Sequence, residues 1–149
     1  MSLPENFNPL ALDNQLCFAL YVCSKEIIRK YQPLLEPLNL TYTMYITLMG
    51  LWERDEVTVK DLGKRLFLDS GTLTPLLKKM ETQNLITRNR SKTDERTVFI
   101  KLTEEGRSLK EKCQKIPMEV ACCNLVDMEK GKALLDCLHQ MMTNLNKED

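Results

Sequence analysis

Residues 66–106 read LFLDSGTLTPLLKKMETQNLITRNRSKTDERTVFIKLTEEG. The apolar side chains in the first part of this stretch recur at spacings of three and four residues, at Leu73, Leu76, Leu77 and Met80. This spacing predicts a helix with one stripe against a core, and Asp69 and Ser70 supply oxygens that can cap its N-terminus. Residues 57–66 show a second short helical pattern, and residues 67–69 form a turn between the two. The pair predicts a helix-turn-helix.

The period of the apolar residues changes from about 3.6 to 2 after Asn84. Residues 85–90 and 97–102 alternate in polarity, and the charged residues 91–96 join them. This pattern predicts an antiparallel hairpin with a charged tip, which is a wing when it follows a helix-turn-helix. The predicted fold class is therefore mainly α with a small β-hairpin wing, in a winged helix-turn-helix domain.

The polar side chains of this region favour binding to double-stranded DNA. Hydroxyls in the first turn, with lysines behind them, suit a helix whose N-terminal end enters the major groove. Arginines on a hairpin suit a narrow minor groove, and Asp94 lies close enough in sequence to hold the guanidinium of Arg96. The candidate DNA-binding residues are Ser70, Thr72, Thr74, Pro75, Lys78, Lys79, Arg88, Arg90, Asp94 and Arg96. A solvated amphipathic helix and a hairpin with ordinary surface charge would show the same pattern.

The distribution of charge supports the DNA-binding interpretation more than the total does. The chain has 21 basic and 21 acidic side chains and no net charge. Residues 64–101, however, hold nine Lys and Arg against four Asp and Glu. The positive excess lies on the predicted DNA-binding segment, so we expect salt-sensitive binding through a limited number of phosphate contacts.

Length and composition exclude several other classes. A chain of 149 residues with 43% hydrophobic residues is expected to form one domain. No apolar run approaches the roughly 20 residues of a membrane span, and no basic segment opens the chain, so we expect a cytoplasmic protein without membrane contact. Its six cysteines would then be reduced thiols. Without a CxxC pair or a glycine-rich phosphate loop, and with His139 as the one histidine, we expect no metal, no cofactor and no enzymatic activity.

Helical patterns flank the winged region on both sides. They cover residues 10–35, 41–52, 103–115 and 127–145, with Pro117 as an interruption. We expect the winged helix at about 41–102 and dimerisation helices at about 8–37 and 103–146. The outer helices are rich in apolar side chains, which favours a homodimer. A two-fold dimer also places two recognition helices in successive major grooves, as a pseudo-palindromic operator requires.

The helix-turn-helix followed by the Asp94-Glu95-Arg96 tip resembles the MarR family of bacterial repressors. Within that family, NQLCF at residues 14–18, together with Tyr21, Tyr31 and FLDSGTLTP at residues 67–75, is similar to the organic-hydroperoxide-sensing (OhrR) type. The resemblance runs from about Asp13 to Pro117 and fades in the last 30 residues. It implies a repressor that leaves its operator when a cysteine is oxidised.

The resemblance implies that Cys17 is the redox-sensing residue and that Tyr21 and Tyr31 tune it. All three share one face of the first predicted helix, and a thiolate near a helix start gains from the helix dipole. Tyr31 is fourteen residues from Cys17, or roughly 21 Å along a straight helix. If Tyr31 serves Cys17, it therefore belongs to the partner subunit, as in the family. The alternative is that Cys17 is a small buried hydrophobe, as most free cysteines are.

Oxidation of Cys17 by an organic hydroperoxide gives a sulfenic acid, which condenses with a second thiol. Family members use either a low-molecular-weight thiol or a resolving cysteine, and Cys122 and Cys123 lie where such a cysteine is found. The other cysteines are interpreted as structural: Cys23, Cys113 and Cys137. Two alternatives remain, namely a MarR-type repressor released by a small aromatic ligand and a thiol peroxidase that uses Cys17 catalytically.

Overall fold

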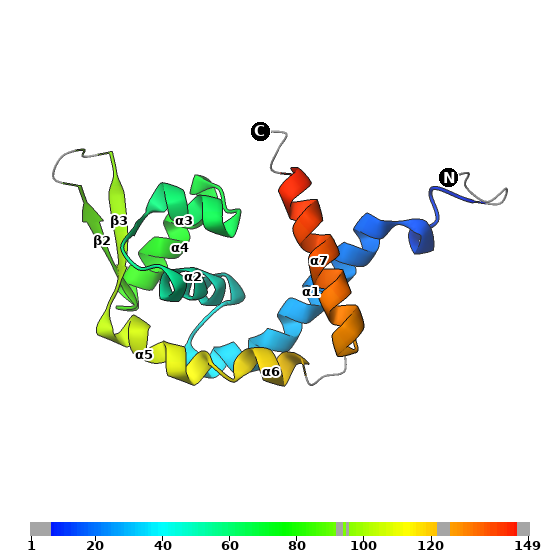
Figure 1. Cartoon of the computed structure of the whole chain (residues 1–149). Helices are drawn as coiled ribbons and strands as arrows, with labels where there is room; N and C mark the ends of the chain where they lie inside the picture. The colour runs from blue at the N-terminus through cyan, green and yellow to red at the C-terminus, as the bar shows by residue number, and fades with distance from the viewer. Residues whose placement is uncertain (1–6, 92–93, 95, 122–125, 146–149) are drawn as a thin grey trace. The chain divides into compact units, whose positions relative to one another are not determined.

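The computed structural model describes residues 7–91, 94, 96–121 and 126–145 (Figure 1). The chain divides into two compact units, of which the first ends at Ile116 and the second begins at Pro117.

The first unit holds the winged helix and the long helix that precedes it. Its elements in chain order are η1 (Leu12–Asn14), α1 (Leu16–Leu35), η2 (Glu36–Leu38), α2 (Tyr42–Glu53), β1 (Val57–Thr58), α3 (Val59–Leu66), α4 (Ser70–Thr82), β2 (Ile86–Arg90), β3 (Val98–Leu102) and α5 (Glu104–Cys113). Helix α6 (Ile116–Ala121) spans the boundary between the units. The prediction of a mainly helical fold with a hairpin wing is confirmed.

Side-chain caps fix where the helices of this unit begin. Thr41, Thr58 and Thr103 each accept a hydrogen bond from a backbone N–H three residues further on, at the starts of α2, α3 and α5. Asp69 caps α4 in the same way. Phe67 takes a left-handed conformation with φ of 54° and ends α3, so that the chain turns into α4 within three residues. The predicted helix-turn-helix is confirmed.

The core of the first unit lies between α2, α3, α4 and the sheet. The predicted stripe of α4 faces this core, because Leu73, Leu77 and Met80 are fully buried and Leu76 is partly buried. They pack with residues of the other elements, among them Leu35, Leu48, Leu51, Leu62, Ile86 and Ile100. Burial of this apolar area is the main stabilising contribution to the unit.

The sheet has three antiparallel strands in the order β1-β3-β2. The hairpin pairs Ile86 with Leu102 at its base and Arg90 with Val98 near its tip. The third strand, β1, was not predicted, since residues 57 and 58 were assigned to the helix that follows them. That assignment is wrong because Val57 pairs with Ile100 and Thr58 with Phe99, so the strand exists only through a partner far away in sequence.

A cluster of polar contacts joins the start of α5 to the winged helix. The indole N–H of Trp52 donates to the carbonyl of Gly106 at 2.9 Å. Asp55 accepts from the N–H of Leu102 at 2.8 Å and from the guanidinium of Arg107 at 3.0 Å. The first part of α5 is therefore fixed to α2 and β3.

The second unit contains α7 (Met128–Leu145), which Asp127 caps through the N–H of Lys130. No residue of α7 is buried, and Leu134 and Leu135 are each about half exposed. Among the described residues, no helix is long and apolar enough to cross a membrane.

Candidate nucleic-acid interface and thiol site

The first turn of α4 presents small polar side chains to solvent. The carboxylate of Asp69 accepts the N–H of Thr72 at one oxygen and the hydroxyl of Thr72 at the other, both at 2.9 Å. These two hydrogen bonds lower the pKa of Asp69, so the cap is ionised at neutral pH. Ser70 and Thr72 are exposed, and Thr74 is half-buried.

The next turns of α4 carry Pro75, Lys78 and Lys79, all exposed. Pro75 lies inside the helix and has no N–H to donate to the carbonyl of Gly71. The helix nevertheless continues to Thr82, because its opposite face is held in the core by Leu73, Leu77 and Met80. The candidate DNA-binding residues of α4 therefore lie on the side of the helix that faces away from the core.

The wing carries Arg90, Asp94 and Arg96 as exposed side chains. Asp94 accepts the backbone N–H of Arg96 at 3.0 Å and the hydroxyl of Thr97 at 2.8 Å. These contacts, that of Thr97 first, lower the pKa of Asp94. Within the described part of the chain, Asp94 forms no ion pair with the guanidinium of Arg96, so the predicted contact is wrong in its detail. Asp94 instead fixes the backbone of the turn, which leaves the Arg96 side chain exposed.

Arg88 lies at the base of the wing and is less accessible than predicted. Its side chain is 23% exposed, and its guanidinium lies 3.8 Å from the carboxylate of Glu81. Glu81 also accepts the backbone N–H of Arg88 at 3.2 Å. Strand alternation accounts for this position, because Arg88 shares the core-facing side of β2 with the buried Ile86. Contact of Arg88 with DNA stays a prediction, while its observed contact joins α4 to the wing.

Cys17 is the second residue of α1 and is exposed in the single chain. The N-cap residue, Gln15, makes no side-chain hydrogen bond to the first turn, so the N–H groups there lack a side-chain cap. Tyr21, one turn further on, is 61% exposed, and the ammonium of Lys25 lies 5.5 Å from the centre of its ring. The site therefore presents a free thiol beside the positive end of a helix. Both the sensing role of Cys17 and the alternative that it is a small buried hydrophobe stay predictions, because this exposure is that of a single chain.

Tyr31 lies in a different environment from Tyr21. It is half-buried, and its ring centre lies 5.1 Å from that of Tyr42 and 5.9 Å from that of Tyr45. Burial raises its pKa, with a smaller contribution from Tyr42. Because α1 is continuous from Leu16 to Leu35, Tyr31 stands roughly 21 Å along the axis from Cys17 of the same chain. The sequence did not reveal this aromatic cluster, because its members come from two helices.

The remaining cysteines differ in accessibility. Cys23 and Cys137 are exposed, whereas Cys113 is buried. Burial raises the pKa of Cys113, which makes it a poor nucleophile and fits a structural role. Cys122 and Cys123 lie outside the described residues, and a resolving role for either stays a prediction. Among the residues that the structure does describe, no cluster of His, Cys, Asp and Glu could hold a metal ion.

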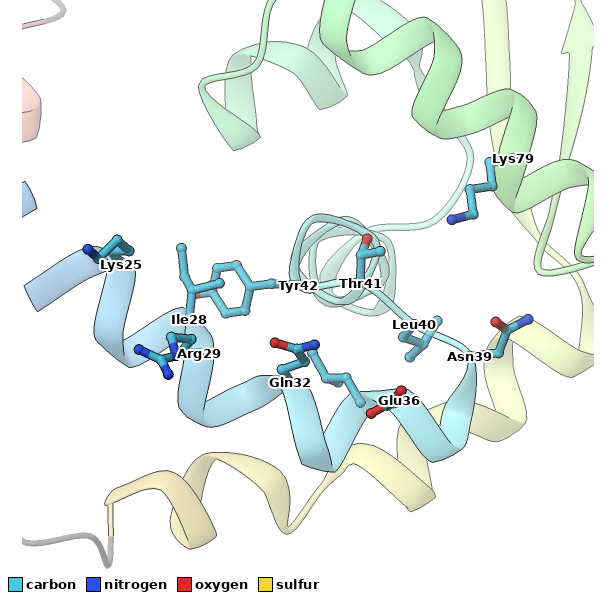
Figure 2. A pocket seen from close by; sticks show the side chains of 11 residues that line it. Lys25, Ile28, Arg29, Gln32, Glu36, Asn39, Leu40, Thr41, Tyr42 and Lys79 are labelled. Carbon is cyan, nitrogen blue, oxygen red and sulfur yellow. The ribbon is translucent and has the colours of Figure 1, made fainter. Parts of the chain in front are cut away.

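A pocket of about 490 Å³ opens beside the C-terminal half of α1 and the start of α2 (Figure 2). Its apolar lining comes from Ile28, Leu35, Leu40 and Tyr42. Its polar lining includes three cationic side chains, with Lys25 and Arg29 on α1 and Lys79 on α4 (Figure 2), together with Gln32, Glu36, Asn39 and Thr41. An apolar surface edged by cations is suited to a small organic anion.

These features define the protein as a winged helix-turn-helix protein with an exposed helix-terminal thiol. Comparison with known proteins agrees with this class. The family of transcriptional regulators described as SarA/Rot matches residues 29–113. The organic hydroperoxide resistance transcriptional regulator of Bacillus subtilis is 46% identical over 147 residues, which cover 99% of this chain and all of that protein.

Two further relatives extend the comparison. The regulator SarZ of Staphylococcus saprophyticus is 46% identical over 136 residues, with 91% of each chain covered. The structure of reduced AbfR bound to DNA, a protein of Staphylococcus epidermidis, is similar with a TM-score of 0.76 and 32% identity, covering 90% of this chain and 94% of that one. The chain belongs to the SarA/Rot family of transcriptional regulators, in the group of the organic hydroperoxide resistance regulators.

Proposed function

We propose that the chain is a homodimeric repressor that binds a pseudo-palindromic operator while Cys17 is reduced and leaves it when an organic hydroperoxide oxidises Cys17. The observation that carries the proposal is an exposed Cys17 in the first turn of α1, in a chain that is similar over its full length to an organic hydroperoxide resistance regulator. The repressor is proposed to act in the cytoplasm.

The winged helix supplies the DNA contacts in this proposal. Helix α4 enters the major groove with Ser70, Thr72, Thr74 and Pro75 near the bases, while Lys78 and Lys79 neutralise phosphates. Arg90 and Arg96 extend from the wing toward the minor groove. The binding of a similar protein, AbfR, to DNA supports this arrangement.

The oxidation step uses the thiolate of Cys17 as nucleophile. The sulfur attacks one peroxide oxygen, the O–O bond breaks, and the remaining oxygen leaves as an alcohol after it takes a proton. Cys17 is then a sulfenic acid, two electrons more oxidised, and it condenses with a second thiol with loss of water. Tyr21 of the same chain and Tyr31 of the partner subunit are proposed to donate hydrogen bonds to the thiolate. Cys17 acts as a sensor in this scheme and not as a turnover catalyst.

Dimerisation is proposed to use the exposed apolar side chains outside the winged helix. Leu12, Leu16 and Phe18 lie at the N-terminal end of the first unit, with exposures of 58%, 64% and 39%. Leu134, Leu135 and Leu145 are exposed on α7 of the second unit. So much exposed apolar surface is unusual for a monomer, and a second copy of the chain would cover it.

Binding of reduced protein to the DNA upstream of its own gene tests the DNA part of the proposal. We expect two chains per operator and an affinity that falls steeply between about 50 and about 200 mM salt, because phosphate contacts release counterions. An equal affinity for operator and scrambled DNA would contradict it.

The pocket of Figure 2 favours a second candidate, a MarR-type repressor released by a small aromatic acid. In that case the ligand would place its ring on Ile28 and Tyr42 and its carboxylate near Lys25 or Arg29, which lie at the same end of the pocket (Figure 2). Salicylate would then release DNA from the Cys17→Ser protein as well as from the wild type. Under the thiol-switch proposal, salicylate has no effect at concentrations where hydroperoxide acts.

A further inference from the structure

We propose that Asp69 fixes Thr72 as a pure hydrogen-bond acceptor, so that Thr72 selects a base with an exocyclic amino group, adenine or cytosine, in the major groove. The inference rests on the proposed DNA-binding function and deepens it, because it states what kind of base one side chain of α4 reads.

The hydroxyl proton of Thr72 is committed to one hydrogen-bond acceptor, the carboxylate of Asp69. The Oγ1 atom of Thr72 lies 2.9 Å from one carboxylate oxygen of Asp69, while the other oxygen accepts the Thr72 backbone N–H. An ionised carboxylate accepts hydrogen bonds and never donates them. The Thr72 hydroxyl must therefore donate to Asp69, and its remaining lone pairs point away from the cap. Thr72 itself is exposed, so these lone pairs are available to a ligand.

Two observations indicate that this orientation is built into the start of α4. A Cβ at residue 71 would lie 2.9 Å from a carboxylate oxygen of Asp69, which is too close. Glycine at this position therefore allows the Asp69 carboxylate to lie where it contacts Thr72. The neighbouring helices α2, α3 and α5 are all capped by threonine hydroxyls, whereas α4 is capped by an acid. An acid beside DNA phosphates is electrostatically unfavourable, and a threonine cap would avoid that cost.

The chemistry of the base edges turns this orientation into specificity. In the major groove, adenine N6 and cytosine N4 are donors, whereas guanine O6 and thymine O4 are acceptors. A free threonine hydroxyl pairs with either kind, because it can donate or accept. Thr72 can only accept, so it favours adenine or cytosine at one position of each half-site. Ser70 and Thr74, for which the described residues provide no side-chain hydrogen-bond partner, have no such restriction.

Selection of bound sequences from a random double-stranded DNA library tests the inference. The proteins compared are wild type, Asp69→Asn, Thr72→Val and Thr72→Ser. Asparagine caps a helix as well as aspartate does, but its amide donates to Thr72 Oγ1 and frees the hydroxyl proton. Thr72→Val keeps the shape of the side chain and removes the hydroxyl. Thr72→Ser keeps the hydroxyl and is the matched control.

We expect wild type and Thr72→Ser to enrich adenine or cytosine at one half-site position. In Asp69→Asn this enrichment over guanine and thymine should fall by roughly fivefold, because the freed hydroxyl can then donate as well as accept. In Thr72→Val the enrichment should disappear, and in both variants the change should be confined to that position. The inference is overturned if Asp69→Asn retains every base preference and lowers affinity for all sequences equally, since Asp69 would then be only a cap. A wild type that enriches no sequence at all would instead overturn the proposed DNA binding, and the inference with it. Thermal unfolding of each variant confirms that the compared proteins are folded.

Discussion

At Gly106, helix α5 passes directly over the backbone that leads into β2. A Cβ on residue 106 would lie 2.1 Å from the carbonyl oxygen of Leu85, which no side chain can tolerate without a backbone shift. The same carbonyl accepts the N–H of Thr103 at 3.1 Å, so it cannot move away freely. This single position thus sets how closely α5 approaches the winged helix.

We expect Gly106→Ala to lower the free energy of unfolding by about 3 kcal/mol, the upper part of the range for an overpacked site. Urea unfolding at neutral pH measures the difference. Gly50→Ala is the matched control, because a Cβ there meets Leu62 and Leu66 at 3.6 Å, an ordinary contact, within a helix that alanine favours. Equal effects of the two substitutions would contradict the close approach of α5.

The carboxylate of Asp55 makes part of the stability of the winged helix depend on pH. Burial alone would raise its pKa, but hydrogen bonds from Leu102, Glu56 and Arg107 outweigh burial and lower the pKa below 3.8. A lowered folded-state pKa means that the contribution is complete above the unfolded value and is lost as pH falls through the folded one.

We therefore expect Asp55→Asn to cost on the order of 1 kcal/mol near pH 7, and the difference from wild type to shrink as the pH falls below about 4. Chemical unfolding at a series of pH values gives both curves. A difference that stays constant down to pH 2.5 would show that the hydrogen bonds do not depend on the charge of Asp55.

At the level of whole elements, the sequence predicted α2, the hairpin and α7 to within two residues, and the start of α4 at its cap, because each has a clear period and its own cap or turn. The sequence did not predict β1, because a strand of two residues is too short to show an alternating pattern. Its pairing with β3 is determined by the fold and not by the local sequence. The sequence also placed Arg88 with the DNA-binding residues, because it could not show that Glu81 of α4 lies beside Arg88. The exposed face of α4 was predictable because it lies opposite a regular apolar stripe, whereas the contact of its residues and of the wing tip with DNA stays a prediction.

The wing provides the clearest prediction for an element. Asp94 holds the turn through the backbone of Arg96, so Arg96→Ala should leave the hairpin intact while it removes one contact to DNA. We expect about tenfold weaker operator binding and a salt dependence reduced by about one counterion. Fluorescence anisotropy at several salt concentrations measures both quantities. Lys132→Ala, which removes an exposed charge of the same sign from α7, should change neither, and an unchanged affinity in Arg96→Ala would remove the wing tip from the interface.

At the scale of the whole molecule, the exposed apolar side chains of α7 should lie between two chains. Leu135 is 51% exposed in the single chain, and a glutamate there would place a charge in the interface. Leu135→Glu should therefore shift the protein toward monomer by at least tenfold in the dissociation constant, as measured by sedimentation. Lys132→Glu, an exposed polar position on the same helix, is the control. A wild type that sediments as a monomer would contradict the dimer.

The proposed thiol switch depends on one link, from the thiol of Cys17 to the operator. The most direct test is a DNA gel shift with reduced protein and with protein treated with one equivalent of cumene hydroperoxide, comparing wild type, Cys17→Ser and Cys23→Ser. We expect all three reduced proteins to bind, and oxidised wild type and Cys23→Ser to release the DNA while Cys17→Ser retains it. Release of DNA by oxidised Cys17→Ser, or retention by oxidised wild type, would contradict the proposed thiol switch.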